Sequence, residues 1–153
     1  MFDLNLPKYT FKTKRENDSI SIFDRCRQKY VALTPEEWVR QNMVEYIIQA
    51  KKFPPARIAN EVTVVINGMN KRSDSVIYDK EMRPRIILEY KAPSVKITQK
   101  VFDQIATYNF ELDVDLLIVS NGLEHYCCKM DKENKKYYFL KEIPDYQQLD
   151  WDK

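Results

Sequence analysis

The run DLLIVS, residues 115–120, constrains the fold more than any other stretch of the sequence. Its four central residues are all large and apolar, so it lacks the alternation of polar and apolar side chains that marks a strand with one wet face. A continuous apolar run of this length is typical of a strand that is covered on both faces. Asn121 and Gly122 supply a turn signal directly after it. We therefore expect a central strand with helices packed on both sides of its sheet.

Two segments with helical spacing are predicted to supply those helices. The first begins at TPEE, where Thr34 is placed as the N-cap and Pro35 in the first turn, and it is expected to end near Lys52. The second is ITQKVFDQIATYNFEL, residues 97–112, whose apolar positions recur at helical intervals.

Short β-type runs, each bounded by turn residues, account for most of the remaining chain. Three lie between the helices at residues 60–67, 73–79 and 85–91, and they predict a three-stranded meander. Two more, HYCCKMD and KKYYFLKEI, predict a hairpin after the central strand. The expected order is α-β-β-β-α-β-β-β, which is an α/β fold with a mixed central sheet.

The length of 153 residues fits one domain with a full hydrophobic core. We expect a single domain over residues 1–153, with a core over 31–142 and a basic arm over 1–30. The formal net charge of +2 is too small to identify a polyanionic partner, although basic residues are concentrated between Lys8 and Lys29. Such an arm suits either a phosphate backbone or solvent.

The three cysteines form no CxxC pair, and the chain has one histidine, His125, so a zinc site or a disulfide framework is not expected. Cys127 and Cys128 are adjacent in a predicted strand and should point in opposite directions. Small buried thiols suit a reducing compartment, and no apolar run reaches the length of a signal peptide or a membrane span. These features predict a cytoplasmic protein.

Three charged side chains are predicted to converge on neighbouring strands. Strand alternation places Glu89 and Lys91 on one face of the strand at 85–91. If this strand pairs with the strand at 73–79, Asp74 lies close to Glu89. Two adjacent carboxylates repel each other unless a cation lies between them, and oxygen ligands select Mg²⁺ or Mn²⁺ over zinc. The pattern therefore predicts a divalent-ion site in which Lys91 holds a water that attacks phosphorus.

Each of these residues also has a simpler structural interpretation. Glu89 and Lys91 alone would form a surface ion pair worth about 0.2–1 kcal/mol, and Asp74 alone would begin a strand. Glu37, three residues after Thr34, is equally well placed to close a capping box.

The order of the motifs is similar to that of a known family of enzymes. RSD at 72–74 followed by EYK at 89–91 resembles the signature of the PD-(D/E)XK nucleases, an Asp followed by an acid, any residue and a Lys on a β-hairpin. QIATY at 104–108 fits the QxxxY element of helicase-associated members. With TPEEWVRQ before these motifs and NG after them, residues 30–130 look like the N-terminal nuclease domain of type I restriction enzyme motor (R) subunits.

The resemblance implies a restriction-endonuclease-like fold and a Mg²⁺- or Mn²⁺-dependent DNA endonuclease. It implies that the metal is held by Asp74, Glu89 and the backbone carbonyl of Tyr90, with Lys91 as the catalytic lysine and Glu37 near the metal. It further implies that Gln104 and Tyr108 support the site or contact DNA, and Arg72 is a candidate for contacting a phosphate or shielding the carboxylates.

Two departures from the family pattern shape the expected partners. Ser73 stands where the signature has proline, and the chain has no GxxxxGK[ST] loop, so it lacks the ATP-driven motor. DNA is the expected partner, together with a helicase or other restriction–modification subunits supplied in trans, and a homodimer would serve to cut both strands. The alternative functions are a catalytically silent nuclease-like module that binds DNA or docks to a partner subunit, and an interaction protein that does not contact nucleic acid.

Overall fold

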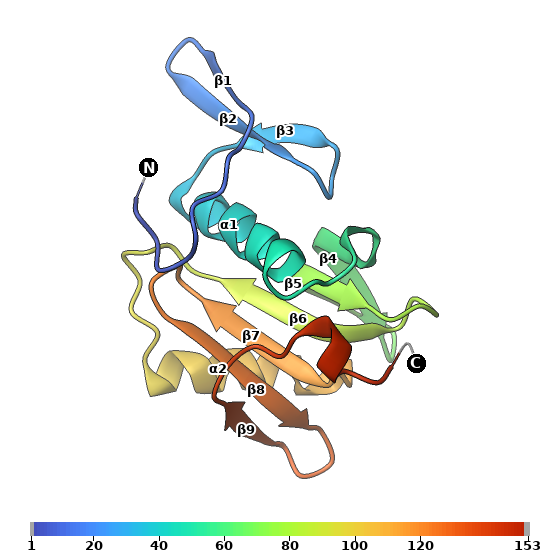
Figure 1. Cartoon of the computed structure of the whole chain (residues 1–153). Helices are drawn as coiled ribbons and strands as arrows, with labels where there is room; N and C mark the ends of the chain where they lie inside the picture. The colour runs from blue at the N-terminus through green and yellow to red at the C-terminus, as the bar shows by residue number, and fades with distance from the viewer. Residues whose placement is uncertain (1, 152–153) are drawn as a thin grey trace.

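The computed structural model describes residues 2–151, which contain a six-stranded mixed sheet, a three-stranded sheet and two α-helices (Figure 1). This architecture confirms the predicted α/β fold. The helices are α1 (Pro35–Gln49) and α2 (Gln99–Asn109), with short 3₁₀ turns at Pro55–Arg57, Phe110–Leu112 and Tyr146–Gln148. The strands are β1 (Thr13–Glu16), β2 (Ser19–Asp24), β3 (Lys29–Ala32), β4 (Ile58–Ile66), β5 (Met69–Tyr78), β6 (Pro84–Tyr90), β7 (Leu116–Ser120), β8 (His125–Asp131) and β9 (Lys136–Leu140).

The six-stranded sheet follows the chain, in the order β4-β5-β6-β7-β8-β9. Strands β4, β5 and β6 form the predicted antiparallel meander. Because α2 lies between them in the chain, β6 and β7 pair in parallel. All five residues of β7 are buried, which confirms the prediction of a central strand covered on both faces.

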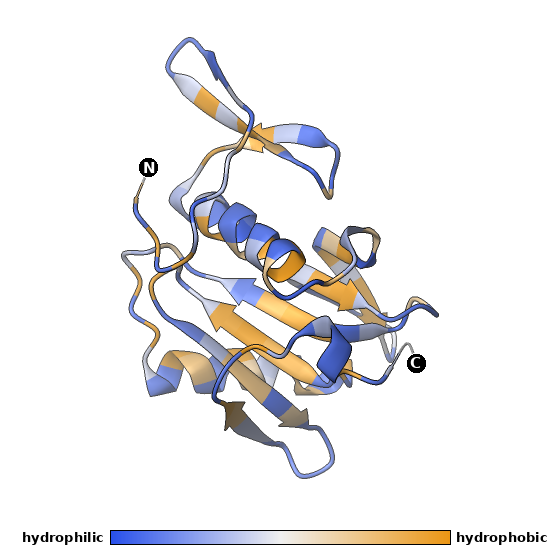
Figure 2. Ribbon diagram, in the orientation of Figure 1, coloured by the Kyte–Doolittle hydropathy of each residue, from blue (hydrophilic) through white to orange (hydrophobic). Residues whose placement is uncertain are grey.

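The two helices cover opposite faces of this sheet, as Figure 1 shows. Val39, Met43 and Ile47 of α1 pack against one face, whereas Phe102 and Ala106 of α2 pack against the other. In Figure 2 the apolar residues are concentrated along β6 and β7, between the two helices. Each fully buried large aliphatic side chain contributes about 1.5–3 kcal/mol to folding relative to an exposed one.

The helix α1 begins at its predicted cap, and α2 begins at a cap of the same type. The hydroxyl of Thr34 accepts a hydrogen bond from the backbone N–H of Glu37 at 3.0 Å, and Thr98 caps α2 in the same way through Val101. The helix α1 ends at Gln49, close to the predicted end. No helix among residues 2–151 has the length and apolar character needed to cross a membrane.

Adjacent Cys127 and Cys128 lie on opposite faces of β8, one in each apolar core, as their positions in the strand predict. Burial raises the pKa of both thiols to about 12. All three cysteines of the chain are free thiols.

Strands β1, β2 and β3 are absent from the predicted order of elements. Most of the segment expected to be a basic arm instead folds into a small antiparallel sheet that stands beyond the N-terminal end of α1 (Figure 1). Its inner face is anchored to the rest of the domain, because Asp24 is buried and accepts a hydrogen bond from the Asn60 side chain of β4 at 2.9 Å.

Candidate active site

Asp74 and Glu89 meet where β5 and β6 separate. The ladder between these strands ends at the pair of Ser75 and Leu88, so Asp74 and Glu89 occupy the next opposed positions. The Oδ2 atom of Asp74 accepts a hydrogen bond from the backbone N–H of Tyr90 at 2.8 Å. The Asp74 carboxylate therefore accepts the N–H that a backbone carbonyl would accept if the ladder continued. This hydrogen bond holds the carboxylate beside Glu89.

The carboxyl group of Glu89 is buried in an unfavourable environment. Its Oε1 atom has no hydrogen-bond partner among the described residues. Burial and the neighbouring carboxylate of Asp74 raise the pKa of Glu89 to about 9, against the opposing effects of Lys91 and Asn109. In the absence of a cation, the pair of Asp74 and Glu89 therefore holds a proton at neutral pH.

Pairing with β7 fixes the end of β6 that carries Glu89 and Lys91. Glu89 lies opposite Val119 in the parallel ladder, and the backbone N–H of Lys91 donates to the carbonyl of Ser120 at 2.9 Å. Lys91 is half-buried, and its charge lowers the pKa of Glu89 and of Glu36. The structure thus brings Asp74, Glu89 and Lys91 together on a rigid support.

The acid of α1 that faces this cluster is Glu36. Burial and the carboxylate of Asp74 raise the pKa of Glu36, while Lys91 lowers it, so Glu36 lies within electrostatic reach of both side chains. Sequence reasoning missed Glu36, although helical spacing provided a signal. Glu36 is exposed, but it lies three residues before Val39 and seven before Met43, in line with the stripe of α1 that packs against the sheet.

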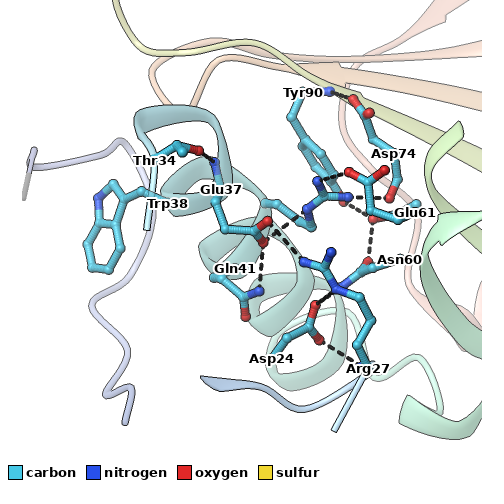
Figure 3. A network of polar contacts seen from close by, with 12 residues as sticks. Asp24, Arg27, Thr34, Glu37, Trp38, Gln41, Asn60, Glu61, Asp74 and Tyr90 are labelled. Atoms are coloured by element: carbon cyan, nitrogen blue, oxygen red, sulfur yellow. Dashed lines mark hydrogen bonds and ion pairs between the residues drawn. The ribbon is translucent and has the colours of Figure 1, made fainter. Parts of the chain in front are cut away.

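Glu37 lies instead within a buried network of ion pairs (Figure 3). Its carboxylate accepts hydrogen bonds from Arg27 at 2.9 Å and from the Gln41 side chain at 2.8 Å, and Arg40 lies 3.0 Å away. The capping box is therefore only half formed, since Glu37 supplies its backbone N–H to Thr34 but uses its side chain elsewhere. These contacts give Glu37 a structural role and connect β2, β3 and α1.

Arg40 connects this network to the candidate site. Its guanidinium group is buried and donates to the backbone carbonyl of Asp74 and to the carboxylate of Glu61. Glu61 also pairs with Arg72, whose Nε atom lies 2.9 Å from Oε2. The candidate phosphate-binding residue Arg72 is thus exposed and held at the outer end of this chain of charges.

Glu61 marks an irregularity in the sheet beside Asp74. Its φ angle of 56° lies in the left-handed region, which costs roughly 1–3 kcal/mol for a residue other than glycine. The β4–β5 ladder pairs Asn60 with Ser75 and Val62 with Ser73 but omits the pair of Glu61 and Asp74. The ion pairs of Glu61 with two arginines hold this conformation, which interrupts the ladder at the position of Asp74.

Gln104 and Tyr108 lie together on the exposed face of α2, as expected from their spacing of four residues. Lys71 of β5 is buried beside them, with its ammonium group 4.4 Å from the centroid of the Tyr108 ring. The residue of α2 that lies next to Glu89 is Asn109. Of the α2 residues, Asn109 therefore reaches the carboxylate pair, whereas Tyr108 contacts Lys71 of β5.

The carboxylate pair fits a divalent cation by its chemistry. An unpartnered buried oxygen on Glu89 and a second carboxylate next to it are both relieved by positive charge. Within residues 2–151, no group of three or more His, Cys, Asp or Glu side chains is close enough to hold a metal ion. An ion bound by Asp74 and Glu89 would therefore need additional oxygen ligands from the backbone or from water.

The environment of Glu89 predicts how stability depends on pH in the metal-free protein. Glu89 has an ordinary pKa of 4.5 and a folded-state pKa of about 9, so between these values the folded state holds a proton that the unfolded chain has released. Its contribution to the free energy of unfolding therefore falls as pH rises through this window. We expect Glu89→Gln to be more stable than wild type near pH 8 in EDTA, with a flatter pH profile in urea denaturation. Parallel profiles for the two proteins would show that Glu89 does not titrate in this way.

Comparison with known proteins assigns the chain to one family. The sequence model of the family described as type I restriction enzyme R protein N terminus matches residues 35–144. This range includes α1, the whole six-stranded sheet and α2. No curated protein matches the chain. The match covers well over half of the sequence and all of the residues at the carboxylate pair. The chain therefore belongs to the family of type I restriction enzyme R protein N termini.

Proposed function

We propose that this chain is a metal-dependent endonuclease domain that hydrolyses phosphodiester bonds in DNA. The observation that carries the proposal is the convergence of Asp74 and Glu89 near the end of β6, with Lys91 two residues after Glu89. Membership of a restriction enzyme family supports the same chemistry.

In this proposal the metal is Mg²⁺ or Mn²⁺, held by Asp74, Glu89 and the backbone carbonyl of Tyr90. When bound, the ion supplies positive charge to the phosphate and favours ionisation of a water nucleophile. Lys91 donates a hydrogen bond that orients this water, and Glu36 faces the same space and accepts its proton. The water oxygen bonds to phosphorus, one ester P–O bond breaks, and the departing oxygen takes up a proton.

The surrounding residues have supporting roles. We propose that Gln104 and Tyr108 contact the DNA strand from the exposed face of α2 and that Arg72 lies close to a phosphate. Glu37 is assigned to the buried network, since its carboxylate already has three cationic or amide partners. These 153 residues contain no P-loop, so any ATP-driven DNA translocation would come from outside them.

Nicking of supercoiled plasmid DNA tests the proposal. We expect the wild-type protein to cut in Mg²⁺ or Mn²⁺ and not in EDTA, and we expect Asp74→Asn to be inactive. Asparagine keeps an oxygen that accepts the hydrogen bond from Tyr90, so this variant should retain the fold, which circular dichroism checks. Equal cutting by both proteins would end the assignment. Salt-sensitive binding of duplex DNA without cleavage by the wild type in saturating metal would favour a catalytically silent DNA-binding module.

A further inference from the structure

The small sheet of β1, β2 and β3 has an outer face that the proposed catalytic chemistry does not use. This sheet lies before residue 35, where the match to the family model begins. Ile22 and Asp24 belong to its inner face, and both are almost fully buried. Figure 1 shows the sheet standing away from the domain, beyond α1.

Strand register places two lysines and two aromatic rings together on the outer face. Lys14 of β1 lies opposite Ser21 of β2. Two residues further along β2, and therefore on the same face, Phe23 lies opposite Tyr30 of β3. Lys12 belongs to the same face, because its carbonyl accepts a hydrogen bond from the backbone N–H of Phe23 at 2.9 Å. Both lysines are exposed, while the rings are half-buried.

The aromatic rings hold the lysines in place without neutralising them. The ammonium group of Lys14 lies 4.2 Å from the centroid of the Tyr30 ring, and that of Lys12 lies 5.9 Å from the centroid of Phe23. By contrast, Arg25 pairs with Glu45, and Arg27 pairs with acids of the buried network. Positive charge is therefore available for an external anion at the two lysines.

This basic face is continuous with the cleft beside the candidate active site. Ser21 lies opposite Ala32, so Ala32 shares the outer face with Lys14. Ala32 also lines a cleft of about 510 Å³, which is bounded on its other side by Glu36 and Ala92, the residue after Lys91. Lys14, Ser21 and Ala32 lie in one row across the outer face, so this face borders the cleft at Ala32.

We propose that the outer face of the β1–β2–β3 sheet binds the phosphate backbone of DNA next to the site of cleavage. Charge complementarity and continuity with the cleft select DNA as the occupant, and the inference rests on the proposed nuclease function. Lys12 and Lys14 contact phosphates and carry no sequence information, so they position the duplex without setting its specificity.

The test is the salt dependence of binding to a labelled duplex in EDTA, where cleavage does not interfere. Each phosphate contact contributes roughly 0.9 to the slope of log K against log salt concentration, so we expect Lys12→Gln/Lys14→Gln to lower the magnitude of the slope by about 1.8 and to weaken binding. The matched control is Lys132→Gln/Lys136→Gln, which removes two exposed lysines at the β8–β9 end of the domain, far from this sheet in Figure 1. The control should bind like the wild type.

An unchanged slope and affinity in Lys12→Gln/Lys14→Gln would overturn the inference. Equal losses of affinity in this variant and in the control, or an absence of DNA binding by the wild type, would also overturn it. Plasmid nicking separates this result from the proposed function. If the wild type and Lys12→Gln/Lys14→Gln cut DNA equally well and bind it equally well, the inference fails while the nuclease assignment stands. If only Lys12→Gln/Lys14→Gln has a smaller slope but neither protein cuts DNA, the sheet binds the phosphate backbone while the nuclease assignment, and with it the placement next to a cleavage site, fails.

Discussion

Replacement of Lys91 by methionine is expected to slow DNA cleavage by about 10²–10⁴-fold, the usual contribution of a group that assists proton transfer. Methionine preserves the apolar stem of this half-buried side chain but cannot donate a hydrogen bond to a water. Asp74 and Glu89 remain, so Mg²⁺ should still raise the Tm of the variant. The measurement is the initial rate of plasmid nicking at saturating Mg²⁺, together with the metal-dependent shift in Tm.

A suitable control for this prediction is Lys129→Met, which removes an exposed lysine from β8. Its nicking rate should equal that of the wild type. If Lys91→Met also cuts at a rate within a few-fold of the wild type, Lys91 does not act in the chemical step. Loss of the Mg²⁺-dependent shift in Tm would instead show that Lys91 is needed to assemble the metal site.

Arg40→Met is expected to lower the free energy of unfolding by about 3–5 kcal/mol, because it removes the most buried cation of this ion-pair network. Arg40 has 4% exposure, and its loss removes one partner from Glu37, one from Glu61 and the donor to the Asp74 carbonyl. Urea denaturation at pH 7 measures the effect as a lower midpoint at an unchanged m-value.

Arg72→Met provides a matched control, since Arg72 pairs with the same Glu61 but its side chain is 74% exposed. This substitution should change stability by no more than about 1 kcal/mol, as is usual for exposed ion pairs. Similar small losses in the two variants would show that the buried network does not hold α1 against the sheet.

The main sheet and both helices were predictable because their signals are local. A cap, a proline and apolar spacing define α1, and a continuous apolar run defines β7. The convergence of Asp74 and Glu89 followed from pairing two adjacent strands as a hairpin.

The small sheet and the buried network were harder to predict because their determinants are tertiary. All four residues of β1 are exposed, so this strand carries no apolar alternation. The alternation of polar and apolar residues in SISIFD was a usable signal for the strand β2. The burial of Asp24 was not predictable in this way, because it depends on hydrogen bonds from Asn60 and Arg27 in the folded chain. The choice between Glu36 and Glu37 likewise depends on where Arg27 and Arg40 lie in the folded chain.

The most direct test of the account is anomalous scattering from a crystal of the wild-type protein soaked in Mn²⁺. We predict a peak between the carboxylates of Asp74 and Glu89, within bonding distance of both, and no such peak in Asp74→Asn. A fully soaked crystal with no peak at this position, or with Mn²⁺ bound only elsewhere, would contradict the central claim that these two acids form a divalent-metal site.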